Sequence, residues 1–483
     1  MSVIPVGDTV RPSALGTSLP FLTAGAVYLV LLTAGNALLN DPDSYWHLVV
    51  GQWIVDHDTV PRADPFSLTF ERAPWIAKEW LSQVIYAAAY GLAGWPGVTL
   101  LAAASMAAAF GLMAGFLARH LAPVPVLVLV CAAFVLFAPH ALARPHALAL
   151  PVMVAWVGCL LSAADRRVAP SFWLLLLMPL WANLHGGFTL GLLLAGAIGL
   201  DAVVRAPDGQ RSATLRHWAT FGGAAAAVAC LTPYGPESML VTYRLRSRGA
   251  ALAAVAEWQS KDYRRLRPIE VCLMAGLGFA LMRGVRMPVV RVLILLGLLH
   301  LGLSSIRNGD ILGLLAPLVI AAPLARQFPE FAAVEGSRLS RQPGLAHVAA
   351  VVALLSVSLG FAWLQDWAPD RRISPVAAVD AIEAAGATPV FNDYSFGGYL
   401  IYRGVPPFMD GRNEVHGGAF ILRHYRAVML ADVSDFLPFL DEYGVQSTLL
   451  APHTPAVAYL DELAGWERLY ADDVAVVHLR VDR

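Results

Sequence analysis

Charged side chains are scarce in this sequence. Asp, Glu, Lys and Arg make up 14% of the 483 residues, whereas a soluble domain carries roughly 25%. Hydrophobic residues account for 57% and the mean hydropathy is +0.59, so the surface has too little charge to face water everywhere. The formal net charge of -1 gives no sign of a nucleic-acid partner. These shortages exclude a wholly soluble chain and indicate an integral membrane protein.

Cysteine is also rare. Its four positions lie inside apolar runs and lack the spacing of metal ligands or of a disulfide framework, so we interpret them as packing residues. They are Cys131, Cys159, Cys230 and Cys272. The first 20 residues lack the charged region, short apolar region and cleavage site of a removed signal peptide. We therefore expect the first apolar run to be retained as a membrane anchor.

Apolar runs that approach the ~20 residues needed to cross a bilayer recur along the first 365 residues. They predict a polytopic α-helical membrane domain over residues 1–365, with about eleven transmembrane helices. The run at 171–184 is short, and its pairing with 187–204 is also compatible with a re-entrant hairpin. The expected spans are 21–39, 96–118, 122–139, 147–164, 171–184, 187–204, 217–233, 269–283, 288–305, 310–325 and 346–364.

Arginines fall in alternate connections between these runs, which is the pattern of cytoplasmic loops. They are Arg119, Arg166, Arg167, Arg205, Arg211, Arg216, Arg283, Arg286, Arg291, Arg326, Arg338 and Arg341. We expect a cell (inner) membrane protein with a cytoplasmic N-terminus, a long outer loop at 40–95 and an extracytoplasmic C-terminus. The basic loop at 244–267 breaks the rule. Either the topology differs there, or these basic residues bind an anion. We favour an anionic lipid as that anion.

The composition changes after residue 365. Short segments with the pattern of strands alternate there with amphipathic helical segments, which predicts a soluble α/β domain over residues 366–483. Strands are expected at 388–391, 398–402, 446–450 and 474–479, and helices at 375–386 and 433–443.

The first outer loop begins with two acidic residues at the bilayer surface, Asp41 and Asp43, where a carboxylate reaches both water and lipid headgroups. A helix from about Tyr45 to Asp56 is expected next. It would place an apolar face toward the membrane interface, formed by Trp46, Val49, Val50 and Trp53. A polar cap followed by surface helices is the plain structural interpretation of this loop.

The stretch DSYWHLVVGQWIVDHDTVPRADPFS resembles the first outer loop of the oligosaccharyltransferase catalytic subunit. More broadly it is similar to the GT-C glycosyltransferases, polytopic enzymes that take a sugar from a polyprenyl-phosphate carrier. The alignment rests on Tyr45, His47, His57 and the turn at Asp64 and Pro65. It places the family's essential carboxylate on Asp43, with Asp41 as the second choice.

A second stretch, NDYSFGGYLIYRGVPPFMDGRNEVHGG at 392–418, resembles the soluble domain of those transferases. Asp393 and Tyr394 stand in the Asp-Tyr places of a Trp-Trp-Asp-Tyr-Gly motif, but its Trp pair is absent. In oligosaccharyltransferases that motif reads the hydroxyl residue of the acceptor sequon, so its loss argues against Asn-glycosylation. A later element of the family corresponds here to Asp410, Gly411, Arg412 and Asn413.

The resemblance implies an inverting displacement in which Asp43 accepts the proton of the acceptor hydroxyl and cations stabilise the departing lipid phosphate. Arg307 and Arg144 are the candidate cations, although a single Arg near a span end also snorkels to headgroups. For Asn183 and His185 a buried structural hydrogen bond explains their place as well as substrate contact does. The other expected substrate contacts are His47, His146, Glu257, Asn308, Asp393, Tyr394, Asp410 and Arg412.

Oligosaccharyltransferases hold a divalent ion partly through an acidic pair in a later outer loop. The corresponding PHALARPH stretch contains His140 and His146 but no acidic pair, so we expect no metal site, with a divalent ion as the alternative. The leading hypothesis is a GT-C glycosyltransferase that uses a polyprenyl-phosphate-linked sugar and an extracytoplasmic glycan, lipid or protein acceptor. One alternative is a flippase for a lipid-linked anion. Such a transporter would be expected to contain an internal repeat, and none is visible in this sequence. The other alternative is a non-catalytic scaffold.

Overall fold

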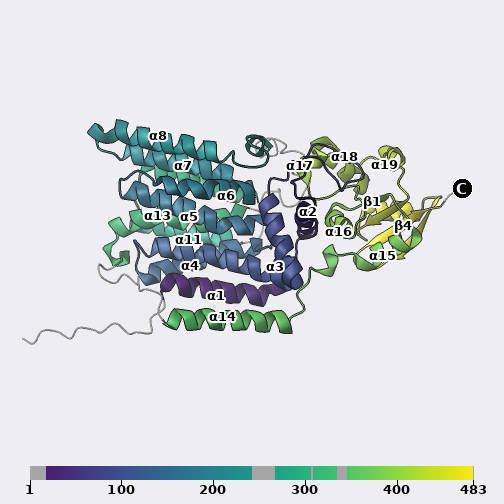
Figure 1. Cartoon of the computed structure of the whole chain (residues 1–483), viewed down its shortest axis with the longest axis horizontal. Helices are drawn as coiled ribbons and strands as arrows, with labels where there is room; N and C mark the ends of the chain where they lie inside the picture. The colour runs from purple at the N-terminus through teal and green to yellow at the C-terminus, as the bar shows by residue number, and fades with distance from the viewer. Residues whose placement is uncertain (1–17, 242–266, 306–307, 334–344, 482–483) are drawn as a thin grey trace, which may run out of the picture.

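The computed structural model describes residues 18–241, 267–305, 308–333 and 345–481. A bundle of long helices occupies one end of the molecule and a small α/β domain the other, with helix α2 between them (Figure 1). The bundle helices are α1 (Leu19–Ala34), α3 (Trp80–Leu117), α4 (Pro123–Phe137), α5 (Pro145–Asp165), α6 (Leu177–Leu184), α7 (Phe188–Val204), α8 (Arg211–Val228), α11 (Pro268–Arg283), α12 (Val289–Ser304), α13 (Gly309–Gln327) and α14 (Leu345–Leu364). Helix α2 covers Asp43–His57.

Each apolar run predicted from the sequence contains a helix of the bundle. Among the described residues, six helices are long and apolar enough to cross a membrane. Three shorter apolar helices cover Phe172–Leu184, Phe188–Val204 and Val289–Ser304, and α8 and α11 fall in neither group. The long apolar helices therefore support the prediction of an integral membrane protein. The number of membrane spans stays a prediction.

Arginines from several connections meet at one end of α5. The carboxylate of Asp165, the last residue of α5, lies 2.6 Å from Arg291, 2.8 Å from Arg326 and 3.6 Å from Arg205. Arg119 donates to Ser162 one turn earlier. With 21 residues, α5 rises about 31 Å, close to the thickness of bilayer hydrocarbon. The arginine pattern of the sequence thus corresponds to one end of the bundle, which we name the basic end.

The C-terminal domain has a four-stranded sheet of order β1-β2-β4-β3. Strands β1 (Val390–Asn392) and β2 (Ser447–Leu450) are parallel, whereas β4 (Val476–Arg480) pairs antiparallel with β2 and with β3 (Trp466–Ala471). The remaining elements are α15 (Val376–Ala385), α16 (Gly397–Tyr402), α17 (Asn413–His416), α18 (Gly418–Val428), α19 (Val433–Glu442) and α20 (Pro455–Asp461). A core of Phe391, Phe408, Phe436 and Phe439 joins β1 to α19.

Two predictions about local structure were wrong. The apolar segment 398–402 forms helix α16 instead of a strand, because Asp393 accepts the backbone N–H of Ser395 and starts a helical turn there. An apolar run this short fits either element, so its pattern does not separate them. The predicted helix after Asp43 is confirmed, but Trp46 and Val50 pack against Ile401 and Val415 instead of the membrane interface.

Candidate active site

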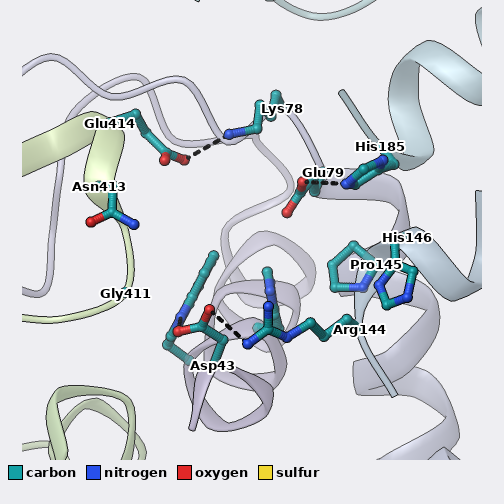
Figure 2. A pocket seen from close by; sticks show the side chains of 12 residues that line it. Asp43, Lys78, Glu79, Arg144, Pro145, His146, His185, Gly411, Asn413 and Glu414 are labelled. Carbon is teal, nitrogen blue, oxygen red and sulfur yellow. Dashed lines mark hydrogen bonds and ion pairs between the residues drawn. The ribbon is translucent and has the colours of Figure 1, made fainter. Parts of the chain in front are cut away.

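A polar pocket lies where α2 and α5 meet the C-terminal domain (Figure 2). Five parts of the chain contribute to it: the start of α2, the end of the outer loop, the start of α5, the end of α6, and the start of α17 with the turn that precedes it. The lining residues are Asp43, Trp46, His47, Lys78, Glu79, Arg144, Pro145, His146, His185, Gly411, Asn413 and Glu414. Charged and imidazole side chains dominate this list, so the pocket suits a polar ligand better than an apolar one.

Asp43 is the first residue of α2, and its carboxylate is held from two sides. Trp46, one turn later, donates its indole N–H to Oδ1 at 2.9 Å, and Arg144 Nη2 lies 3.7 Å from Oδ2. A Cβ at Gly411 would overlap the carboxylate, so a larger residue there would require the Asp43 side chain to move. The Asp43 side chain keeps 17% of its surface exposed. It is oriented and still accessible, as a group that exchanges a proton must be.

Asp41 lies behind Arg144 and outside the pocket lining. It is fully buried, and both of its carboxylate oxygens contact the Arg144 guanidinium, one of them at 2.6 Å. Asp41 Oδ1 also accepts the backbone N–H of Asp43 at 3.0 Å. A buried bidentate pair of this kind fixes the plane of a guanidinium. Asp41 therefore positions Arg144 and the first turn of α2.

The opposite wall of the pocket contains two further charged pairs. Lys78 Nζ lies 3.5 Å from Glu414 Oε1, and His185 Nε2 lies 3.4 Å from Glu79 Oε1. The ring of His146 is 6.3 Å from that of His185. Figure 2 shows these pairs around a shared opening, with Asp43 and Arg144 across from Lys78. Carboxylates and cations thus face one cavity from both walls.

A divalent ion is not supported by the donor arrangement. Across the described part of the chain, no three His, Cys, Asp or Glu side chains stand close enough to hold a metal ion. In the pocket, Glu79 faces His185 and Asp43 faces Arg144, so each acid already has a cationic or imidazole neighbour. We therefore derive no chemical step through a metal.

Asp410 and Arg412 belong to a buried ionic cluster outside the pocket lining. Arg412 donates to Asp410 at 2.7 and 2.9 Å and to Asp64 of the outer loop at 2.5 Å, and both Asp410 and Arg412 have no exposed surface. Burial alone would raise the pKa of Asp410, but the charges of Arg412 and His416 outweigh it and hold that pKa well below its ordinary value. This cluster, which we name the latch, ties the outer loop to the C-terminal domain.

Four of the other predicted contacts also lie outside the pocket lining. Asn183 accepts the indole N–H of Trp80 at 2.6 Å and donates to the carbonyl of Leu231 at 2.9 Å. Tyr394 accepts from Asn413, Asp393 starts a turn, and Asn308 donates to the carbonyl of Leu301. Glu257, Arg307 and the basic loop 244–267 lie outside the residues that the structure describes.

The pocket unites five predicted residues, Asp43, His47, Arg144, His146 and His185, and adds charged residues that the sequence analysis missed. Lys78, Glu79 and Glu414 are the additions. Lys78 and Glu79 stand immediately before the long apolar helix α3, where a charged pair beside a span end is a usable signal. Glu414 directly follows the DGRN element, and only the fold shows that it reaches the outer loop.

The comparisons with known proteins identify the fold. No protein-family model matches the chain, and no curated protein matches it by sequence. Among solved structures, ArnT from Cupriavidus metallidurans, bound to undecaprenyl phosphate, is similar over 95% of this chain and 97% of its own, with a TM-score of 0.50 and 15% identity. The apo oligosaccharyltransferase of Archaeoglobus fulgidus is similar over 89% of this chain and 69% of its own, with a TM-score of 0.52 and 11% identity. The chain has the fold of the GT-C glycosyltransferases.

The GT-C fold extends over the whole described architecture. A match over 95% of this chain includes the helix bundle and the C-terminal domain together. The resemblance that two short stretches indicated is therefore confirmed at the level of fold. In this chain the same two stretches form neighbouring walls of the pocket, because Asp43 comes from the first and Gly411 from the second.

Proposed function

We propose that this chain is a membrane glycosyltransferase that transfers a sugar from a polyprenyl-phosphate-linked donor to an extracytoplasmic acceptor. One observation carries the proposal: Asp43, Arg144 and Lys78 line a single pocket at the end of the bundle opposite the basic end. By the positive-inside rule the basic end faces the cytoplasm, which puts the pocket on the outer side. The undecaprenyl phosphate in the similar ArnT structure supports a polyprenyl-phosphate partner.

In the proposed reaction the acceptor hydroxyl attacks the anomeric carbon from the face opposite the lipid phosphate. A new C–O bond forms, the bond between the anomeric carbon and the phosphate oxygen breaks, and the phosphate leaves with the electron pair. The hydroxyl proton passes to Asp43, whose carboxylate is partly exposed. Inversion at the anomeric carbon follows from attack and departure on opposite faces.

Arg144 and Lys78 are the proposed partners of the phosphate. The Arg144 guanidinium stays charged when it is partly desolvated, and Asp41 fixes its orientation. Lys78 is only 13% exposed, and its ammonium lies 3.5 Å from Glu414 Oε1 at the pocket wall. The donor phosphodiester is already an anion, and its negative charge grows as the bond to the sugar breaks, so two preorganised cations stabilise the transition state more than the ground state.

The test is the rate of transfer by Asp43→Asn. Purified variants are added to native membranes whose lipid-linked sugars carry tritium, and the loss of label from the polyprenyl-phosphate fraction is measured. Removal of a general base lowers the rate by about 10²–10⁴-fold. Asp56→Asn is the matched control, because Asp56 lies on the same helix, is exposed, and among the described residues accepts a side-chain hydrogen bond from Gln52 alone.

Glu79→Gln distinguishes Asp43 from Glu79, a second carboxylate of the pocket. If Asp43→Asn transfers sugar at the wild-type rate, Asp43 is not the base. If Glu79→Gln alone abolishes transfer under the same conditions, the base is Glu79.

A further inference from the structure

A second charged pocket lies between the end of α11 and the end of α13. It is an open cavity of about 570 Å³, lined by Arg283, Arg286, Arg326 and Gln327 together with Pro288 and Pro323. This volume falls in the range of about 300–1,000 Å³ typical of pockets for small ligands. With three arginines in its wall, the cavity suits an anion.

This pocket belongs to the opposite membrane face from the candidate active site. Arg326 in its wall lies 2.8 Å from Asp165, the last residue of α5, whereas Arg144, which precedes the first residue of α5, lines the active site. The two pockets are thus separated by the rise of α5, about 31 Å for its 21 residues. A headgroup bound here would belong to the leaflet at the basic end.

The charges of the pocket are only partly compensated. Arg283 pairs with Glu330, and Arg326 pairs with Asp165. Within the described residues no carboxylate pairs with the guanidinium of Arg286, which is exposed. The backbone around it is fixed, because Arg286 donates its N–H to Gln327 Oε1 at 2.7 Å and Gln327 donates to the carbonyl of Gly284 at 2.8 Å. Among the described residues, Arg286 is thus a cation on a fixed backbone with no carboxylate against its guanidinium.

An apolar surface leads away from the pocket along α11. Ile269 is the single buried residue of this helix in the described part of the chain, and one apolar face of the helix is exposed. Met274, Leu277 and Leu281 are 57%, 62% and 74% exposed, and their spacing puts them on one face. A phosphate at the level of Arg283, where α11 ends, would leave its acyl chains beside this face. A soluble phosphate would make no use of it.

We infer that this pocket binds the phosphate of an anionic phospholipid at the basic end of the bundle. Basic pockets between transmembrane helices recognise anionic headgroups through such clusters, and each basic residue adds to the attraction. The exposed apolar face of α11 can contact acyl chains, which free phosphate lacks. The site therefore suits a lipid phosphate better than free phosphate. This inference does not depend on the proposed transfer reaction, because it concerns a different pocket and a binding equilibrium.

Native mass spectrometry of the purified full chain with added phosphatidylglycerol tests the inference. Wild-type protein should retain phosphatidylglycerol in preference to phosphatidylcholine, and Arg286→Gln should weaken phosphatidylglycerol binding about fivefold. Arg216→Gln is the control, because Arg216 is an exposed arginine on α8 that lies outside this pocket. Equal losses in both variants, equal binding of the two lipids, or displacement of phosphatidylglycerol by millimolar inorganic phosphate would overturn the lipid assignment.

Discussion

Lys78 shows how a single charged residue of the pocket can be tested apart from the chemistry. It is the last cation of the outer loop before α3, and its contact with Glu414 at 3.5 Å joins that loop to the C-terminal domain. Hydrogen bonds to charged groups contribute about 1.5–3 kcal/mol. We therefore expect Lys78→Ala to weaken the binding of undecaprenyl phosphate to the purified protein by about tenfold or more, measured by titration with the lipid in detergent.

Arg72→Ala provides the comparison for this titration. Arg72 belongs to the same loop, its side chain is 88% exposed, and its ion-pair partner is its neighbour Glu71. Its removal should leave the affinity within twofold of wild type, because exposed ion pairs contribute little. Equal affinities of Lys78→Ala and Arg72→Ala would remove Lys78 from the phosphate site.

The DGRN element shows what could and could not be predicted at the level of residues. Its resemblance to the family pointed to a segment that lines the pocket, but consecutive residues of the turn face different ways. Asp410 and Arg412 enter the latch, whereas Gly411 and Asn413 line the pocket. Sequence spacing alone does not show which residues of an irregular turn face a cavity. The predicted contacts were therefore Asp410 and Arg412, whereas their neighbours Gly411 and Asn413 line the pocket.

The placement of α2 depends on its close approach to α3. A Cβ at Gly51 would overlap the backbone carbonyl of Gln83 and contact Ala87, and backbone atoms cannot yield as a side chain tip can. The same helix pair is joined by the hydrogen bond from Gln83 to His47 at 3.2 Å. Gly51→Ala should therefore push α2 and Asp43 away from α3, at a cost of about 1–3 kcal/mol.

This prediction is checked by the unfolding midpoint in detergent and by the transfer rate, both of which should fall. Gly91→Ala is the matched substitution, because Gly91 lies on α3 and a Cβ there would meet nothing within 4 Å. In a helix this change is neutral or stabilises by roughly 0.5–1 kcal/mol. A Gly51→Ala protein as stable and active as Gly91→Ala would contradict the close-packing argument.

At the level of elements, the apolar runs were the most informative part of the sequence. A run long enough for a membrane span has few alternatives to a helix, and helices occur in all the predicted runs. Short segments of the C-terminal domain were less certain. The segment 398–402 became α16, and β3 was not predicted at all, because only its first residue, Trp466, is fully buried and its apolar alternation is weak.

At the scale of the whole molecule, contacts between distant segments complete the site. The latch brings Asp64 of the outer loop onto Arg412 of the C-terminal domain, and Tyr45 of α2 binds Ser374 at 2.6 Å. Burial raises the pKa of Tyr45 to about 12, so this hydroxyl remains neutral over the physiological range. No local pattern encodes such pairs. The predicted family supplied the order of the segments, and the fold supplied their contacts.

His424 makes the stability of the molecule depend on pH. Burial in the aromatic core of the C-terminal domain lowers its pKa to about 4, although its hydrogen bond to the Asn392 carbonyl and the charge of Asp393 favour the protonated form. An unfolded histidine has a pKa of about 6.5. Between these values the unfolded chain binds more protons than the folded one, so the free energy of unfolding falls as pH drops from about 6.5 to about 4, by up to about 3 kcal/mol.

We therefore expect the unfolding midpoint of the purified full chain to be constant above about pH 6.5 and to decrease below it. Asp410 keeps its charge through this window, because Arg412 holds its pKa low. His424→Gln should make the decrease shallower even if it lowers the midpoint at every pH, and His478, whose pKa is also lowered by burial, should account for part of the slope that remains. His453→Gln, at an exposed histidine of the same domain, should retain the wild-type slope. A slope unchanged in His424→Gln would mean that other groups titrate in this window and that burial of His424 does not set the acid sensitivity of the fold.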